Sequence, residues 1–257
     1  MIPKNIVFIG AGNVATNLAV AYKNTGINIF QIYSRMEINA IQLAKKTGAS
    51  YTDKLSSVAD DADLYIIAVS DTILPAIVNE LKIKNKFVVH TSGFHSIDVL
   101  SGISENYGVL YPLQTFSKNR LLDFTLIPVC IEANSLENTT LLESIARVIS
   151  SDIKKINSVK RKKIHLAAVF ACNFTNYMYN IAQDILKTEN VSFDIIKPLL
   201  IETANKILEQ NPSDAQTGPA RRNDNMIIIE HINMLDENKY RILYKIISEN
   251  ISEIYNK

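Results

Sequence analysis

The chain has 257 residues, of which 47% are hydrophobic and 21% are charged, and its formal net charge is +1. This length allows one large domain or two of ordinary size, and the composition is typical of a soluble globular protein. A chain so close to neutrality lacks the basic surface of proteins that bind nucleic acid or anionic membranes. The one basic cluster, at residues 160–163, is short, and we interpret it as the solvated start of a helix.

Cysteine content and hydropathy exclude further classes of protein. Cys130 and Cys172 lie in apolar stretches without a CxxC partner, so the sequence predicts neither a disulfide framework nor a metal site. No secretory pattern precedes the first predicted strand, and no apolar run reaches membrane-spanning length. We therefore expect a cytoplasmic protein whose partners include no metal ion, membrane or nucleic acid.

The first half of the chain alternates short β-branched runs with helical patterns. Helices are predicted at residues 13–24 and 37–47, and strands at 5–9, 27–33, 64–69, 87–90, 109–111 and 127–132. Such alternation is typical of a parallel sheet covered by helices on both faces. Because crossovers between parallel strands are right-handed, we predict a doubly wound α/β fold of the Rossmann type.

Only helical patterns follow Ser158. They cover residues 158–187, 193–210, 224–235 and 238–255, with a polar, turn-rich loop at 211–223. Asp224 is expected to cap the third of these helices. We therefore place a domain boundary near Asn157, which separates an α/β domain at residues 1–157 from an all-α domain at 158–257.

A glycine-rich turn follows the first predicted strand and opens the first helix. It reads Gly10-Ala-Gly-Asn-Val-Ala15, the GxGxxA pattern of dinucleotide-binding domains. Gly10 permits the tight turn, and Gly12 lets the backbone approach a pyrophosphate. The N–H groups that open the helix, at Asn13 and Val14, are expected to face the anion. We assign these glycines and N–H groups to cofactor binding; the alternative is a tight turn that binds nothing.

The end of the second predicted strand distinguishes the two nicotinamide dinucleotides. NAD-specific domains usually end this strand with a carboxylate that binds the ribose 2′-hydroxyl. Here the strand ends on Ser34 and Arg35, and no carboxylate occurs before Glu37. A hydroxyl and a guanidinium suit a 2′-phosphate, since arginine pairs bidentately with phosphate and stacks on adenine. The sequence therefore favours NADP over NAD, with a surface arginine that binds no ligand as the alternative.

Three further predicted strands end on polar residues at the same edge of the sheet, where open α/β sheets bind their ligands. We assign Val69, Ser70, Asp71 and Ser92 to the nicotinamide side of the cofactor, and Gln114 and Thr115 to the substrate. Ser70 and Asp71 have an equally open alternative role, which is to cap a helix that begins near Thr72.

Two histidines and an asparagine are the candidate catalytic residues. Histidine is the side chain best suited to proton transfer near neutral pH, and His90 ends a strand at the ligand-binding edge. Its alternative role is a hydrogen bond within the strand end. At 100° per residue, Asn173 and Asn176 lie about 80° and about 20° from His165 around a long apolar helix. We expect this polar stripe to face a cleft, with His165 and Asn173 in catalysis; a buried structural network is the alternative.

Residues 216–224 combine turn residues with two adjacent arginines. Adjacent guanidiniums at a turn can clamp a carboxylate or phosphate. We therefore assign Thr217, Arg221 and Arg222 to substrate binding. The alternatives are that Asp224 only caps the next helix and that the arginines form a salt bridge across a dimer contact.

Together these motifs resemble those of a bacterial family that joins a Rossmann-like domain to a C-terminal domain of unknown function, DUF2520. The matching segments are Gly10-Ala-Gly-Asn-Val-Ala15, His90-Thr-Ser-Gly93, Tyr111-Pro-Leu-Gln-Thr-Phe116, the helix from His165 to Asn173, and Thr217-Gly-Pro-Ala-Arg-Arg-Asn-Asp224. They cover nearly the whole chain. At Tyr111 the family usually has a histidine, so no acid–base role is assigned there.

More distantly, the chain is similar to pyrroline-5-carboxylate reductase, F420-dependent NADP oxidoreductases and 3-hydroxyisobutyrate dehydrogenases. This resemblance implies a helical domain like the C-terminal domain of 6-phosphogluconate dehydrogenase, hydride transfer between NADP and a small substrate, and dimerisation through the helical domain. The chain has no lysine where the hydroxyacid dehydrogenases place a catalytic one; His165 lies nearby instead.

Two functions follow as hypotheses. The first is an NADP-dependent oxidoreductase that acts on a small anionic carbonyl or imine. The second is a non-catalytic NADP-binding sensor or partner-binding protein on the same fold. An apolar stripe at residues 227–229 and on the last helix predicts a buried partner surface, most simply in a homodimer.

Overall fold

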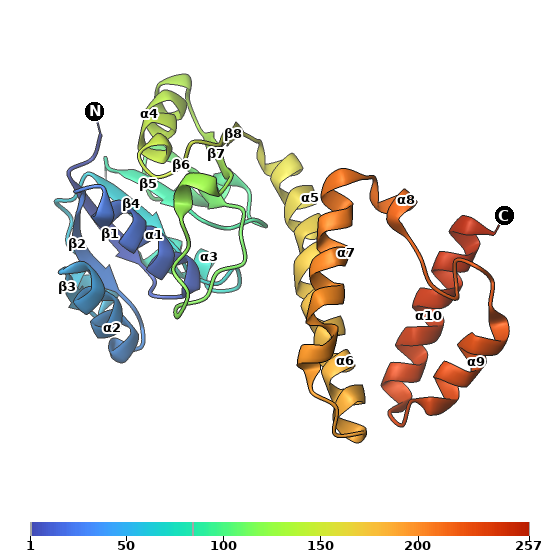
Figure 1. The fold of residues 1–257 in the computed structure, drawn as a ribbon. Coiled ribbons are helices and arrows are strands. Elements are labelled where there is room, and N and C mark those ends of the chain that lie inside the picture. The colour runs from blue at the N-terminus through green and yellow to red at the C-terminus, as the bar shows by residue number, and fades with distance from the viewer. Residues whose placement is uncertain (1, 84, 257) are drawn as a thin grey trace. The chain divides into compact units, whose positions relative to one another are not determined.

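The structure is a computed structural model that describes residues 2–83 and 85–256. The chain divides into two compact units, Met1–Phe170 and Ala171–Lys257, and each is described by itself. Figure 1 shows the α/β architecture of the first unit and the helices of the second. No helix among the described residues is long and apolar enough to cross a membrane.

The first unit is built on one eight-stranded sheet with the strand order β3-β2-β1-β4-β5-β6-β7-β8. The strands are β1 (Asn5–Ile9), β2 (Asn28–Tyr33), β3 (Ser50–Thr52), β4 (Leu64–Ile67), β5 (Phe87–His90), β6 (Asn106–Pro112), β7 (Val129–Ala133) and β8 (Ile153–Lys155). The order reverses between β1 and β4, and in open α/β sheets this switch point is where ligands bind. The predicted doubly wound fold is confirmed.

Helices cover both faces of this sheet. They are α1 (Asn13–Asn24), α2 (Glu37–Thr47), α3 (Leu74–Glu80) and α4 (Leu136–Arg147), with 3₁₀ turns at Leu55–Ser57, Ile97–Leu100 and Phe124–Leu126. A further helix, α5 (Ser158–Ala168), follows the last strand. Successive residues of β1 face different cores: Phe8 packs with Leu18 of α1 on one face, and Val7 with Ile77 of α3 on the other. Two buried faces explain why the strands read as continuous apolar runs instead of alternating ones.

The sheet departs from the all-parallel prediction at one pair. β7 runs antiparallel to β6, with Val129 opposite Pro112, and β8 is again parallel to β7. The segment between β6 and β7 contains a 3₁₀ turn at Phe124–Leu126 but no crossover helix, so the chain re-enters the sheet from the edge at which it left. This loop therefore stays at the carboxyl edge of β6.

The second unit is helical, as predicted. Its helices are α6 (Thr175–Thr188), α7 (Lys197–Glu209), α8 (Pro212–Ala215), α9 (Asn225–Met234) and α10 (Asn238–Tyr255), with a 3₁₀ turn at Phe193–Ile196. A π-helical segment, Val169–Phe174, connects α5 with α6 across the division between the units. The last strand of the sheet ends just before Asn157, whereas the two compact units divide after Phe170. The domain boundary near Asn157 therefore stays a prediction.

Candidate functional site

A cavity of about 410 Å³ lies at the carboxyl edge of the sheet in the first unit. The turns after β1, β2 and β4 line it, and six predicted cofactor residues meet there: Gly10, Gly12, Ser34, Arg35, Val69 and Ser70. Among the described residues, no aspartate or glutamate lines this cavity. Its charged side chains are Arg35 and Lys118, so the cavity suits an anionic ligand.

The glycine turn has the geometry that a bound pyrophosphate requires. Gly10 has φ +116°, and a Cβ there would lie 2.3 Å from the carbonyl oxygen of Ala68. Gly12 is the N-cap of α1, and a Cβ there would meet no atom within 4 Å. Because Gly12 has no side chain, no side-chain hydrogen bond caps α1, and the first N–H groups of the helix are available to an anion. The backbone therefore fits the diphosphate of a dinucleotide.

Asp71 and Ser92 connect the ends of β4 and β5. The Ser92 hydroxyl donates a hydrogen bond of 2.6 Å to the Asp71 carboxylate and accepts from the N–H groups of Phe94 and His95. α3 begins only at Leu74 and has no side-chain cap, so the alternative capping role of Ser70 and Asp71 is wrong. Neither Asp71 nor Ser92 is among the residues that line the 410 Å³ cavity, and their assignment to cofactor binding stays a prediction.

His90 is completely buried, and both of its ring nitrogens are engaged. Nδ1 accepts a hydrogen bond of 3.1 Å from the Ser92 N–H, and Nε2 lies 3.3 Å from the Ser96 carbonyl oxygen, to which it donates. Burial, reinforced by the positive charge of Arg161, lowers the pKa of His90 to about 3. This geometry does not fit the predicted acid–base role of His90; it fits the alternative, a histidine hydrogen-bonded at the strand end.

His165 lies beside the end of β5 and pairs with a residue to which the sequence assigned no role. Its Nδ1 is 3.1 Å from the Tyr111 hydroxyl, and the two rings meet edge to face. Gly93 makes this position possible, because a Cβ there would lie 2.7 Å from Cγ and Nδ1 of His165. Burial raises the pKa of Tyr111 to about 12, so its phenol stays neutral. The only sequence signal for this pair was Tyr111 itself, which lies within β6 where the resembling family usually has a histidine.

Arg161 is a second residue that the sequence analysis missed. Its side chain is 0% exposed, which corrects the interpretation of residues 160–163 as a wholly solvated helix start. The guanidinium donates to the carbonyl oxygens of Ser92 and His95, and pairs with the Glu132 carboxylate at 2.6 Å. It thereby holds α5, and His165 one turn further along, against the end of β5.

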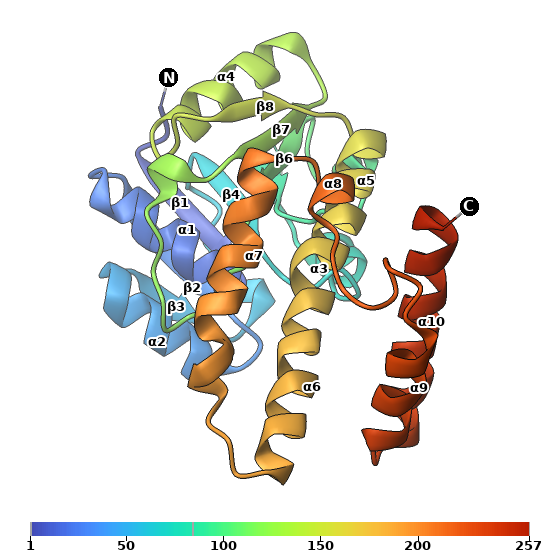
Figure 2. The ribbon, with the colours of Figure 1, turned by 45° about the vertical axis from the view of Figure 1, so that its right-hand side comes forward.

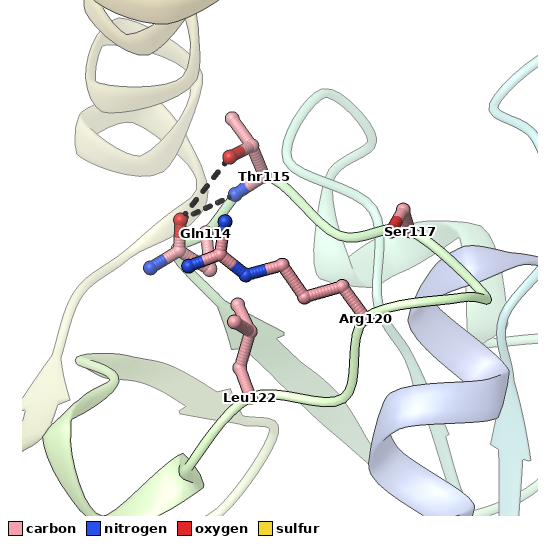
Figure 3. A pocket seen from close by; sticks show the side chains of 5 residues that line it. All are labelled: Gln114, Thr115, Ser117, Arg120 and Leu122. Carbon is pink, nitrogen blue, oxygen red and sulfur yellow. Dashed lines mark hydrogen bonds between the residues drawn. The ribbon is translucent and has the colours of Figure 1, made fainter.

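Gln114 and Thr115 line a second cavity of the first unit, of about 240 Å³, together with Ser117, Arg120 and Leu122. Figure 3 shows that the oxygen of Gln114 turns toward Thr115, whose N–H donates to it at 2.7 Å. The Arg120 guanidinium lies beside Gln114 in the same view and forms no ion pair with any described residue. The groups left free in this cavity are mostly hydrogen-bond donors.

The predicted residues of the second unit do not all meet in one place. Thr217 lines an apolar cavity of about 250 Å³ between α6 and α10. The Arg222 fork binds the Asp224 carboxylate at 3.1 and 3.0 Å. Asp224 is the N-cap residue of α9, as predicted, but its side chain forms no cap hydrogen bond with the helix. Arg221 stacks on Tyr255, with one buried N–H group that has no partner.

Asn173 lies in the π-helical segment, which changes the geometry behind the predicted polar stripe. A π-helix closes each turn with i→i+5 hydrogen bonds, so a residue there advances by less than the 100° used for an ideal α-helix. The angles calculated for Asn173 and Asn176 relative to His165 are therefore wrong. The catalytic assignment of Asn173 stays a prediction.

No group of histidine, cysteine, aspartate or glutamate side chains that could hold a metal ion occurs among the described residues. Cys130 and Cys172 are both free thiols, the first buried and the second exposed.

Two protein families match consecutive parts of the chain. Residues 5–93 match the family described as NADP oxidoreductase, coenzyme F420-dependent. Residues 127–251 match the domain of unknown function DUF2520. The first match contains the glycine turn and every lining residue of the cavity of about 410 Å³ except Lys118, and the second contains Glu132, Arg161 and His165.

Solved structures resemble the chain over nearly its whole length. A candidate NADP oxidoreductase of Bacteroides fragilis is 45% identical over 97% of this chain and 98% of its own, with a TM-score of 0.92. A Thermotoga maritima protein is 22% identical over 98% and 100%, with a TM-score of 0.80. An imine reductase of Myxococcus stipitatus, solved with NADP⁺, shares the fold at 14% identity over 98% and 93%, with a TM-score of 0.65. No functionally curated protein matches the chain.

The glycine turn, the anion-binding cavity, the order of the two matched families and the 45% identical relative agree with one another. The chain belongs to the family of NADP oxidoreductase-like proteins that join a Rossmann domain to a DUF2520 domain.

Proposed function

We propose that the protein is an NADP-dependent oxidoreductase that transfers a hydride to or from a small anionic carbonyl or imine compound. The observation that carries this proposal is the cavity in which the N-terminus of α1 meets Ser34, Arg35 and Lys118, without a carboxylate among its described lining residues. A carboxylate at this place would favour the 2′-hydroxyl of NAD. Two cations and a hydroxyl favour the 2′-phosphate of NADP.

The proton that accompanies the hydride is assigned to His165. When bound, the nicotinamide supplies or accepts the hydride. In the reducing direction, His165 donates its Nε2 proton to the oxygen or nitrogen of the substrate, while its Nδ1–H donates to the Tyr111 oxygen. Because Tyr111 keeps its own proton, it holds the ring in one orientation without exchanging charge with it.

The anionic part of the substrate is assigned to the cavity of Gln114, Thr115 and Arg120. An arginine without a carboxylate partner can bind a carboxylate bidentately, and the Gln114 amide can add a donor. Gln114 follows Tyr111 by three residues, so their Cα atoms lie within about 11 Å. One small molecule can therefore reach both the anion site and the Tyr111–His165 pair. Thr217, Arg221 and Arg222 stay predicted substrate contacts, and Asn173 stays a predicted catalytic residue.

A homodimer is part of this proposal. Among the described residues of the second unit, Ala220 and Ser248 alone are buried, while large apolar side chains such as Leu199 and Ile229 are exposed. A unit of this kind lacks a core of its own, and burial against a second copy would remove that apolar surface from water.

The test has two stages. NADPH should raise the melting temperature more than NADH does, and a panel of keto acids and cyclic imines should contain a compound that oxidises NADPH in the presence of the protein. His165→Gln should abolish that oxidation but keep the NADPH-induced shift. Tight NADPH binding without turnover on every compound would favour a sensor, and no thermal shift with either dinucleotide would refute the cofactor assignment.

A further inference from the structure

The loop that follows β6, residues 113–122, carries a side chain into the cofactor cavity; we call this loop the strap. Figures 1 and 2 show it running beside α1. Asn17 of α1, only 2% exposed, donates to the Ser117 carbonyl oxygen at 3.0 Å and accepts from the Leu122 N–H at 3.4 Å. A backbone bridge between Ser117 and Arg120 closes the tip. The strap is therefore attached to the helix whose N-terminus faces the cavity.

Lys118 lies at the tip of the strap and lines the same cavity as Ser34 and Arg35. Its ammonium donates a hydrogen bond of 2.9 Å to the side-chain oxygen of Asn39, in the first turn of α2. Its backbone oxygen accepts from the Lys46 ammonium at 3.2 Å. Contacts on both the side chain and the backbone thus direct Lys118 toward the β2–α2 turn, where a dinucleotide places its adenosine ribose.

The positive charge of Lys118 and Arg35 has no acidic partner in the described part of the chain. Lys118 and Arg35 form no ion pair with any described residue, and no carboxylate among those residues lines the cavity. Two like charges that face one cavity repel each other, and this arrangement is favourable when an anion binds between them. A 2′-phosphate carries about two negative charges, whereas the 2′-hydroxyl of NAD carries none.

We propose that Lys118 is a specificity-determining residue that binds the 2′-phosphate of NADP from the strap, opposite Arg35. This inference rests on the proposed cofactor and extends it to a residue outside the Rossmann βα turns. Arg35 supplies a planar fork, and Lys118 supplies a compact charge whose three donors satisfy Asn39 and phosphate oxygens together.

The dissociation constants of NADPH and NADH, measured by isothermal titration calorimetry, test this assignment. Lys118→Ala should raise the NADPH constant about tenfold, a usual loss for a charged hydrogen bond, and leave the NADH constant within twofold. Lys118→Arg should retain most of the NADPH affinity. Lys45→Ala removes an exposed charge from α2 outside the cavity and should change neither constant by more than twofold.

Two smaller ligands, which lack the nicotinamide, test the contribution of the 2′-phosphate to binding by itself. The Lys118→Ala variant should lose affinity for 2′,5′-ADP and bind 5′-AMP like the wild type. Equal weakening of both ligands, or no weakening, overturns the role of Lys118. If the wild-type protein prefers NADPH but the variant keeps that preference, this inference alone fails. A wild-type protein that binds neither dinucleotide overturns the proposed function as well.

Discussion

Gly93 is the residue on which the position of His165 depends most directly. A Cβ at Gly93 would lie 2.7 Å from two atoms of the imidazole, so Gly93→Ala must displace the ring and break its 3.1 Å contact with Tyr111. Because a displacement of about 1 Å in a catalytic group can cost about 100-fold, we expect kcat to fall by that order with the substrate found by screening.

The affinity for NADPH should not change in Gly93→Ala, since Gly93 does not line the cofactor cavity. Gly102→Ala is the matched control, because a Cβ at Gly102 meets no atom within 4 Å. A kcat within twofold of wild type in both variants would remove His165 from the reaction.

His90 makes the stability of the fold depend on pH. Its pKa is about 3 in the folded chain, because burial disfavours the cation, and about 6.5 when unfolded. Below pH 6.5 the unfolded chain binds a proton that the folded chain does not. The free energy of unfolding therefore decreases by about 1.4 kcal/mol per pH unit between 6.5 and 3 from this residue alone.

Urea unfolding of the wild type and His90→Gln at pH 7.5, 5.5 and 4.5 checks this dependence. Glutamine offers both a donor and an acceptor but does not titrate, so the variant should lose stability at pH 7.5 and show the flatter dependence on pH. Other groups contribute equally to both proteins. Parallel curves for the two proteins would show that His90 titrates alike in the folded and unfolded chains.

At the scale of elements, α5 is attached to the sheet by one buried ion pair. Arg161 is fully buried, and Glu132 of β7 is its acidic partner. Glu132→Gln leaves the guanidinium buried with only neutral acceptors, and losses of about 3 kcal/mol are usual when one partner of a buried pair is removed. Urea unfolding should show this loss.

Glu143→Gln is the control for this substitution. Glu143 pairs with Arg147 and Lys155 at the surface, where water and salt screen ion pairs, so its loss should change the stability little. Equal losses in the two variants would contradict the attachment of α5 through Arg161.

The elements that the sequence predicts well are those specified by nearby residues. α1, α2 and α10 have their predicted bounds, and the glycine turn is local in the chain. β3 and β8 were not predicted, because three-residue edge strands with polar residues leave no periodic pattern. The antiparallel direction of β7 depends on where a loop without a crossover helix returns, which no local pattern encodes.

The residues of the candidate site likewise include some that the local sequence predicts and others that only the packing of distant segments brings together. Gly10, Gly12 and Arg35 follow from the strand ends that carry them, and the structure brings them together. The pairs Tyr111–His165 and Glu132–Arg161 join residues 54 and 29 positions apart. Such pairs form only when the loops and α5 pack on the sheet edge, so residue type alone cannot identify them.

At the scale of the whole molecule, the exposed apolar surface of the second unit predicts the oligomeric state. Leu199 of α7 and Ile229 of α9 are 63% and 59% exposed. If a second copy covers these faces, the wild type should elute at about twice its 28.8 kDa mass in light-scattering chromatography. Burying a lysine without a partner is costly, so Leu199→Lys and Ile229→Lys should shift the equilibrium toward the monomer.

Leu126→Lys provides the comparison, since Leu126 is an equally apolar side chain, 81% exposed, in the first unit. It should leave the dimer intact, because the proposed interface belongs to the helical unit. The dependence of the melting temperature on protein concentration is a second criterion. A unit without its own core should melt at a lower temperature when dilution separates the copies. A wild type that is monomeric at micromolar concentration, with a melting temperature independent of concentration, would mean that the helical unit is stable without a partner.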